Sequence, residues 1–298
     1  MRVGGRAQWL LEPATPEELR AALCAAREQG LSARVLGGGA NLLIADGELP
    51  GCVIATDRLR RVFRPGGGEG GDAFEAGPDA RSAPAPREQD ARLVAWCGAS
   101  LPGLVRRAAE LGWSGLECLA GVPGQLGGGV AMNAGGSQGW MWDVVELVRV
   151  IDGAGRVRDL ARAQCDPRYR DGNLGELVVA GAVLRLRPDD PAAVRERSNE
   201  HLRRKNEVQP VTEASSGCIF KNPDPELADG RTAGRLIDDC GLKGLARGAA
   251  VVSAKHANFI VNRGGARASD VFALIADVRA RVLETSGVAL ALEVRTWP

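Results

Sequence analysis

Residues 115–136 read GLECLAGVPGQLGGGVAMNAGG, a long run that is dense in glycine and poor in charge. A flexible linker is a poor explanation for it, because linkers carry polar residues rather than Leu, Val and Met. Glycines at this density let backbone amides approach an anion or a flat ring without a clash from Cβ atoms. The segment therefore predicts a ligand-binding loop.

A second glycine-rich segment, GGGAN at 37–41, follows a predicted strand at 33–36. It does not complete the dinucleotide fingerprint G-x-G-x-x-G, because Leu42 occupies the last glycine position. On these residues alone a tight β-turn is an equally good interpretation. Together, however, two such loops in adjacent lobes favour a pyrophosphate and an isoalloxazine ring held between them.

The composition limits the classes of partner. The 298 residues include 38 basic and 37 acidic side chains, a net charge of +1. This balance argues against a nucleic-acid footprint or a polybasic membrane surface, since both need a concentrated excess of cations. The sequence has no apolar run of ~18 residues and no secretory signal, so we expect a cytoplasmic protein without a membrane partner.

Cysteines and histidines do not suggest a metal centre. Seven cysteines are an odd number without close pairing, and in a chain without an export signal they are expected to be reduced thiols. The two histidines, His201 and His256, stand alone, and no Cys/His spacing resembles a zinc site. We therefore predict no metal site.

The remaining patterns predict a mixed α and β chain with a break near 188–200. Residues 64–90 are rich in Gly, Pro, Ala and charge, with only Phe74 to anchor a core, and predict a mobile surface insertion or hairpin tip. Helices are expected at 16–29, 101–111, 192–206, 232–240 and 269–286, and strands at 33–36, 52–55, 93–96, 147–151, 177–186 and 258–261.

Eight motifs occur in a fixed order along nearly the whole chain outside 64–90. They are RVLGGGANLLIADG at 34–47, the segment 115–136, YR at 169–170, QP at 209–210, SSGCIFKNP at 215–223, AGRLIDDCGLKG at 233–244, VVSAKHANFIVN at 251–262 and LEVR at 292–295. In this order they resemble the UDP-N-acetylenolpyruvoylglucosamine reductase (MurB) family. The length resembles the shorter type of that family, which lacks an extra substrate-covering loop.

The resemblance implies an α+β fold of the FAD-binding vanillyl-alcohol-oxidase/PCMH type. Two FAD-binding α+β lobes would occupy 1–60 and 61–190. A C-terminal α+β substrate lobe would occupy 191–298, with its last strand returning to the active site.

The resemblance also implies an activity, with FAD as cofactor and NADPH as co-substrate. NADPH would reduce FAD and leave, and UDP-N-acetylglucosamine enolpyruvate would take its place. Flavin N5 would then transfer hydride to the vinyl carbon, and protonation of the neighbouring carbon would give UDP-N-acetylmuramate for peptidoglycan synthesis. The partner would be this small molecule, and the protein a monomer.

Three positions match the catalytic set of the family. Arg170 would bind the substrate carboxylate and spread the enolate charge, and Glu293 would assist as an acid or polarise the enol. Cys218 stands where the usual pattern has serine as the proton donor. The exchange is chemically tolerable, because a thiol is a stronger acid than an alkyl hydroxyl. Gly172 is a second departure, from the family's Y-R-x-S pattern.

Binding residues follow from the same resemblance. Asn222 and Lys221 would contact the sugar nucleotide; Arg204 could meet the diphosphate or belong to a solvated helix end, and His256 could bind substrate or be a plain surface histidine. FAD would be held by Gly37, Gly38, Gly39, Ala40, Asn41, Leu42, Gly121, Pro123, Gly124, Gly127, Gly128, Asn133, Ala134 and Gly135.

Two other functions fit the same scaffold: an FAD-dependent oxidase that uses oxygen, and a non-catalytic regulator that binds FAD or a UDP-sugar. An oxidase has no need of an enol-protonating set. Retention of Arg170, the segment GCIFKNP and Glu293 in one chain therefore favours the reductase.

Overall fold

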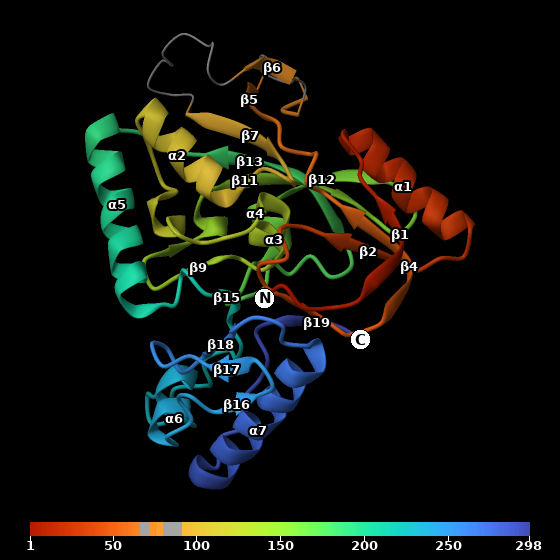
Figure 1. The fold of residues 1–298 in the computed structure, drawn as a ribbon. Coiled ribbons are helices and arrows are strands. Elements are labelled where there is room, and N and C mark those ends of the chain that lie inside the picture. The colour runs from red at the N-terminus through yellow and green to blue at the C-terminus, as the bar shows by residue number, and fades with distance from the viewer. Residues whose placement is uncertain (66–71, 75, 80–90) are drawn as a thin grey trace. The chain divides into compact units, whose positions relative to one another are not determined.

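Helices and strands are interspersed along the chain in the computed structural model, which describes residues 1–65, 72–74, 76–79 and 91–298 (Figure 1). This confirms the mixed α and β composition. The helices of the described residues are α1 (Pro16–Glu28), α2 (Leu101–Leu111), α3 (Leu126–Ala131), α4 (Arg162–Cys165), α5 (Pro191–Val208), α6 (Ala233–Asp239) and α7 (Ala268–Ser286), with 3-10 turns η1 (Glu117–Leu119) and η2 (Met141–Asp143).

The chain divides into two compact units. Unit 1 consists of Met1–Gln8, Gly39–Pro50 and Arg204–Pro298, and unit 2 of Trp9–Gly38 and Gly51–Arg203. The two units do not follow the boundaries expected at 60 and 190, so the division into three lobes stays a prediction.

A six-stranded sheet forms the centre of unit 2. One of its two central strands, β13, is buried along nearly its whole length, and it pairs antiparallel with its neighbours on both sides. In order, the strands are β12 (Val157–Ala161), β11 (Val145–Ile151), β13 (Val178–Arg185), β7 (Arg92–Trp96), β5 (Val62–Pro65) and β6 (Ala76–Asp79).

Smaller pairings complete this unit. A three-stranded sheet has the order β1 (Arg6–Leu11), β4 (Glu48–Ala55), β2 (Ala33–Leu36), and its strands β1 and β4 also contain residues of unit 1. The two-stranded pairs are β9 (Gly135–Gly136) with β10 (Gly139–Trp140), and β8 (Trp113–Ser114) with β14 (Arg187–Pro188).

The predicted helix ends are confirmed where local capping signals are strong. In α1, the Glu18 N–H donates to Thr15 Oγ1 at 3.1 Å. In α2, the Gly103 N–H donates to Ser100 Oγ at 3.1 Å, and Gly112 ends the helix at φ +67°. A side-chain acceptor at the N-cap satisfies an amide that the helix itself leaves unpaired, so both signals act locally.

Part of the glycine-rich stretch 64–90 is ordered on the sheet. β5 and β6 pair antiparallel, and the Phe74 ring packs against a small cluster of buried side chains that includes Phe63. The Arg149 guanidinium lies 4.2 Å from the Phe74 ring centroid, so Phe74 is indeed an anchor. The predicted mobility falls on residues 66–71, 75 and 80–90, which lie outside the described residues.

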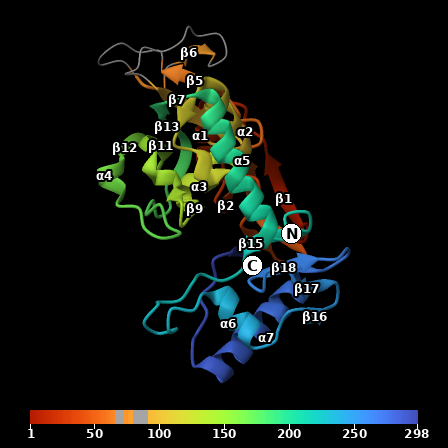
Figure 2. The same ribbon diagram turned by 90° about the vertical axis from the view of Figure 1, so that its left-hand side faces the viewer.

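Unit 1 is built on a four-stranded antiparallel sheet with α6 and α7 side by side, α7 lying along β16 and β17 (Figures 1 and 2). The buried face of α7 includes Val271, Leu274 and Ile275, whereas Phe272 is only partly buried. The sheet order is β15 (Ala214–Cys218), β18 (Phe259–Asn262), β17 (Ala250–Val252), β16 (Ala246–Arg247), and a separate parallel pair joins β3 (Leu42–Ile44) to β19 (Arg295–Trp297).

The described ranges contain neither a helix that could span a bilayer nor a metal-binding cluster. None of the helices there combines the length and the hydropathy that a bilayer span needs. No group of three or more His, Cys, Asp or Glu side chains in those ranges is arranged to hold a metal ion.

Candidate active site

The two glycine-rich segments meet in unit 2. A Cβ atom at position 38 would lie 3.1 Å from Gly124 Cα, and one at position 37 would lie 3.4 Å from Gln125 Oε1. Gly121 and Gly124 have φ values of +73° and +106°, which favour glycine. The structure therefore brings the two segments together, with the closest approach between Gly38 and Gly124. Their contact with FAD stays a prediction.

Gln125, which the sequence analysis did not single out, fixes the second segment to the end of β4. Its buried carboxamide accepts a hydrogen bond from Thr56 Oγ1 at 2.6 Å and donates one to Asp57 Oδ1 at 2.9 Å. Further on, a Cβ at position 127 would press on Cys97, whereas one at position 128 would meet nothing within 4 Å. Close backbone approach beside open space suits a diphosphate or a flat ring.

Asn133 uses its side chain within the protein. At φ +43°, it donates from Nδ2 to the Arg168 carbonyl at 3.0 Å, and its Oδ1 accepts from the Trp142 N–H at 3.2 Å. The amide thus ties the end of the glycine segment to the turn that carries Arg170. Its direct contact with FAD stays a prediction, as do those of Ala134 and Gly135.

Arg170 lies in a tight two-residue turn closed by hydrogen bonds between Arg168 and Asp171. Its φ is +56°, a strained conformation for a residue with a side chain. Nη1 donates to the Gly135 carbonyl at 2.8 Å, and the guanidinium carbon lies 5.3 Å from the rings of both Trp140 and Tyr169. The cation is therefore held in a defined place, as recognition of a planar carboxylate requires.

Close packing explains why glycine stands at position 172, where the family pattern has serine. A Cβ at this position would lie 2.3 Å from the Val130 carbonyl oxygen, and the Gly172 N–H donates to the Ala131 carbonyl at 2.9 Å. A serine here cannot be accommodated unless the backbone shifts. The turn of Arg170 therefore packs closely on the end of α3, and glycine permits that packing.

Cys218 and Glu293 lie on neighbouring backbone segments of unit 1. An irregular register between Ser215 and Cys218, with Gly217 at φ +78°, turns the end of β15. The next residue, Ile219, accepts a hydrogen bond at its carbonyl from the Glu293 N–H at 2.8 Å. Two residues that are far apart in sequence thus lie on adjacent backbone segments, and their catalytic roles stay predictions.

Asn258 fixes this arrangement, and the sequence analysis gave it no role. It is 4% exposed, its Oδ1 accepts from the Phe220 N–H at 2.9 Å, and its Nδ2 donates to the Phe220 carbonyl at 2.8 Å. Its own carbonyl accepts from the Ile219 N–H at 2.9 Å. A polar residue at the start of an apolar strand was the only signal in the sequence.

Asn41, predicted to bind FAD, lies beside Glu293. Its Nδ2 donates to the Glu293 carbonyl at 3.1 Å, and its own carbonyl accepts from the Arg295 N–H at 3.1 Å. The parallel pairing of β3 with β19 continues this contact, with Leu42 opposite Arg295. Gly39, Ala40, Asn41 and Leu42 therefore belong with the segment that carries Glu293.

The predicted substrate-binding residues have separate surroundings within unit 1. Lys221 and Asn222 follow Cys218 closely, and Asn222 Oδ1 accepts from the Ala233 N–H at the start of α6, at 3.1 Å. Arg204 is exposed on α5. Substrate contacts for these residues stay predictions.

His256 is half-buried rather than a plain surface residue. Its ring lies 4.9 Å from that of Phe259, and its Nδ1 accepts from the Asn258 N–H at 3.2 Å. A Cβ at Gly234 would approach its Cε1 to 3.0 Å, so the imidazole covers the start of α6. Burial lowers the pKa of His256, which favours the neutral ring.

A cavity of about 850 Å³ also opens in unit 2. It is lined by four arginines, among them Arg106 and Arg107 of α2, and by Asp57 and Gln125. Of the second glycine-rich segment only Gln125 lines it, and none of the residues predicted to bind FAD does.

Comparisons with known proteins connect these features to a family. Residues 209–297 match the family model described as UDP-N-acetylenolpyruvoylglucosamine reductase, C-terminal domain, and residues 85–161 match the one described as FAD binding domain. These matches confirm the predicted α+β fold with an FAD-binding domain.

Relatives of the same description match over nearly the full chain. The UDP-N-acetylenolpyruvoylglucosamine reductase of Moorella thermoacetica is 38% identical over 99% of this chain and 89% of that protein. The corresponding protein of Rhodospirillum rubrum is 41% identical over 99% of this chain and 85% of its own length. The crystal structure of the reductase from Thermus caldophilus superposes with a TM-score of 0.74 at 36% identity, covering 99% of this chain and 94% of that one.

Proposed function

The chain belongs to the UDP-N-acetylenolpyruvoylglucosamine reductase family of FAD-dependent oxidoreductases, and from this premise we propose that it reduces UDP-N-acetylglucosamine enolpyruvate to UDP-N-acetylmuramate, with NADPH as electron donor. This reaction would supply a precursor for peptidoglycan synthesis. The observation that carries the proposal is the pairing of two backbone segments, in which the Glu293 N–H is bonded to the residue that follows Cys218. We further propose a cytoplasmic monomer.

The residues present fit FAD. Gly37, Gly38, Gly121 and Gly124 provide a backbone that can approach a diphosphate closely, and Gly128 borders open space. FAD, when bound, supplies the hydride that is added to the vinyl carbon of the substrate. The tasks left to the protein are to orient the double bond, to stabilise the developing negative charge and to deliver one proton.

Arg170 is proposed to bind the substrate carboxylate. Its guanidinium is oriented by the Gly135 carbonyl and by two aromatic rings, so it loses little freedom when it engages a planar anion. As negative charge spreads onto the carboxylate during the reaction, the fixed cation stabilises it more strongly than it stabilises the neutral double bond.

Cys218 is proposed as the proton donor. Its Sγ–H would give a proton to the carbon next to the one that receives hydride, leaving a thiolate that regains a proton from solvent. Glu293 would polarise the enol from the neighbouring backbone segment. Lys221, Asn222, His256 and Arg204 are proposed to bind the sugar nucleotide, on the basis of the family resemblance.

The proposed reaction is tested by following NADPH oxidation without oxygen in the presence of UDP-N-acetylglucosamine enolpyruvate. Oxidation equal in amount to the added substrate supports the reductase. Reduction of FAD that only oxygen relieves would indicate an oxidase. A protein that binds FAD but reacts with neither NADPH nor substrate would indicate a regulator.

The role of Cys218 is tested by two substitutions. Cys218→Ser is expected to keep substantial turnover, because serine retains a proton donor of similar size. Cys218→Ala is expected to keep reduction of FAD by NADPH but to lower the substrate half-reaction by about 100-fold or more, the usual contribution of a general acid. Rapid-mixing absorbance of the flavin separates the two half-reactions.

Cys240→Ala is the matched control for these variants, since Cys240 is another partly buried cysteine of unit 1, at the end of α6. It should leave both half-reactions at the rate of the parent. Unchanged turnover of Cys218→Ala would remove Cys218 from the mechanism.

A further inference from the structure

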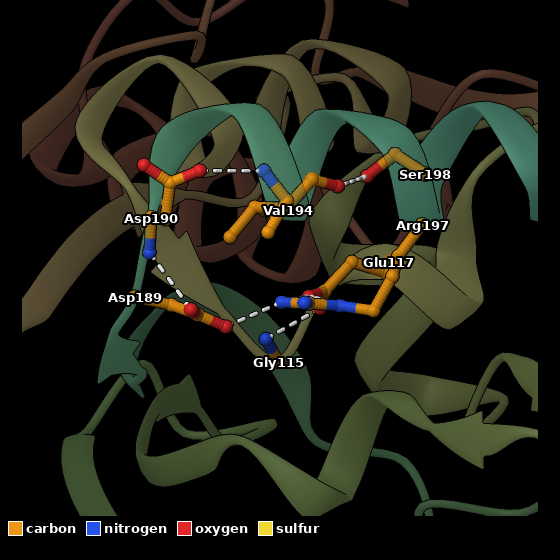
Figure 3. Close-up of polar contacts among 8 residues, drawn as sticks. Gly115, Glu117, Asp189, Asp190, Val194, Arg197 and Ser198 are labelled. Atoms are coloured by element: carbon orange, nitrogen blue, oxygen red, sulfur yellow. Dashed lines mark hydrogen bonds and ion pairs between the residues drawn. The ribbon is translucent and has the colours of Figure 1, made fainter.

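A buried acid lies at the start of the second glycine-rich segment. Glu117, in η1, is 7% exposed. Its Oε2 accepts from the Gly115 N–H at 2.6 Å, and its Oε1 accepts from Arg197 Nε at 3.1 Å and Nη2 at 2.9 Å (Figure 3). Burial opposes the charged form, but these donors outweigh it and hold the pKa of Glu117 below its usual range.

Arg197 reaches Glu117 from α5, and the first turns of that helix are fixed independently. The Asp189 N–H donates to the Gly112 carbonyl at 2.7 Å, and the Ala193 N–H donates to Asp190 Oδ1 at 2.9 Å. Val194, one turn before Ser198 on the same helix, is buried in unit 2. Arg197 Nη2 also contacts Asp189 Oδ2 at 2.5 Å, so the guanidinium joins two carboxylates (Figure 3).

A series of short hydrogen-bonded turns connects Glu117 to the glycines that follow it in the second glycine-rich segment. The Glu117 carbonyl accepts from the Ala120 N–H at 3.0 Å, and the Leu119 carbonyl accepts from the Val122 N–H at 2.9 Å. Gly124, two residues later, contacts the first glycine-rich segment at Gly38. Each turn restricts the backbone conformation of the next one. A displacement of Glu117 would therefore also displace the loop Gly121–Gly124.

We propose that Glu117 and Arg197 are positioning residues for FAD. Neither side chain has to touch the cofactor; together they set the conformation in which Gly121–Gly124 receives the diphosphate. The inference rests on the proposed assignment of this loop to FAD.

The test is a titration of the apoprotein with FAD, followed by quenching of flavin fluorescence. Glu117→Gln keeps the size of the side chain and an oxygen acceptor but removes the charge that binds Arg197. We expect its Kd for FAD to rise about tenfold or more, since hydrogen bonds to charged groups are the stronger class. At saturating FAD, kcat and the KM for the sugar nucleotide should stay near those of the parent.

Arg197→Lys and Arg197→Ala extend the test to the partner. Lysine keeps the charge but lacks the two-pronged guanidinium, so its Kd for FAD should lie between those of the parent and the alanine variant. A purely structural role would instead make the loss of FAD affinity follow the loss of thermal stability in all variants.

Glu146→Gln is the matched control. Glu146 is a partly buried acid of unit 2 whose Oε2 also accepts from two arginines, Arg92 at 3.0 Å and Arg185 at 2.6 Å, but it lies in β11 outside both glycine-rich segments. It should lower stability without changing the Kd for FAD. Equal shifts of Kd in Glu117→Gln and Glu146→Gln, or no shift in either, would overturn the inference.

The outcomes separate this inference from the proposed function. If the parent binds FAD and Glu117→Gln binds it equally well, only the positioning role fails. If the parent itself does not bind FAD, the proposed function fails first.

Discussion

At the residue scale, the turn of Arg170 shows how backbone geometry selects side chains. Arg170 occupies a conformation that costs about 1–3 kcal/mol for a residue other than glycine, and close packing around the turn holds it there. Two positions later, Gly172 lies so close to the Val130 carbonyl that a side chain would displace the turn. The strained backbone at Arg170 and the missing side chain at Gly172 therefore act together to fix the guanidinium.

Restoring the family's serine at position 172 is therefore expected to harm this protein. Gly172→Ser should lower the free energy of unfolding by about 1–3 kcal/mol, the usual range for overpacking, and should raise the KM for the enolpyruvyl substrate through displacement of Arg170. Chemical denaturation and steady-state kinetics measure the two effects. A serine variant with the stability and KM of the parent would contradict the close packing.

His256 predicts a dependence of stability on pH. Its pKa is lowered in the folded protein, chiefly by burial, so the unfolded chain binds the proton more readily. Its contribution to stability is therefore present above the unfolded pKa of ~6.5 and is lost as the pH falls toward the folded pKa. Thermal melts between pH 7.5 and 5.5 should show a smaller decrease in Tm for His256→Gln than for the parent.

His201→Gln is the control for this measurement, because His201 is the other histidine of the chain and lies on α5. It should retain the pH dependence of the parent. If both variants lost it equally, His256 would not be its source.

At the element scale, the segment after Cys218 is held from two sides. Asn258 binds the backbone of Ile219 and Phe220 on one side, and the Glu293 N–H binds Ile219 on the other. Neither set of contacts forms a continuous strand ladder. Each hydrogen bond therefore contributes more to the position of Cys218 than it would in a regular sheet. An isolated β-bridge between Phe220 and Leu292, a few backbone bonds and the Asn258 side chain here take the place of a regular sheet.

Asn258→Ala tests this arrangement. It leaves the buried amide and carbonyl of Phe220 without their partner, and we expect a loss of about 2–4 kcal/mol in the free energy of unfolding. Displacement of Cys218 should also lower the rate of the substrate half-reaction while leaving flavin reduction by NADPH unchanged. Asn262→Ala is a useful control, because Asn262 is the asparagine at the other end of β18, and its side chain bonds to Met1, Gly264 and Ala266 instead.

At the scale of the whole molecule, helix ends could be predicted from the sequence, whereas contacts between residues far apart in the chain could not. The ends of α2 followed from Ser100 and Gly112, because capping acts within a few residues. The approach of Glu293 to Ile219, and of Arg197 to Glu117, joins residues about 75–80 positions apart. No local pattern encodes such pairs; the resemblance to a family suggested the first and gave no indication of the second.

FAD is expected to stabilise the folded protein by mass action. At a free concentration 100 times its Kd, a ligand that binds only the folded state adds about 2.7 kcal/mol to the free energy of unfolding. The apoprotein should therefore melt at a lower temperature, and added FAD should restore the Tm in a concentration-dependent way. FMN, which lacks the diphosphate and adenosine, should restore less, because the glycine loops are then only partly filled. Equal effects of the two flavins would contradict a diphosphate at Gly38 and Gly124.

The parallel pairing of β3 with β19 has a consequence for synthesis on the ribosome. The strand that contains Leu42 has no partner until Arg295, about 250 positions later, has been synthesised. At translation rates of about 5–20 residues per second, that delay is roughly 12–50 s. During this time Asn41 has neither the Glu293 carbonyl nor the Arg295 amide to bind. The part of the site around Asn41 and Glu293 is thus completed late in the life of the nascent chain, after the sheet of unit 2 has already emerged.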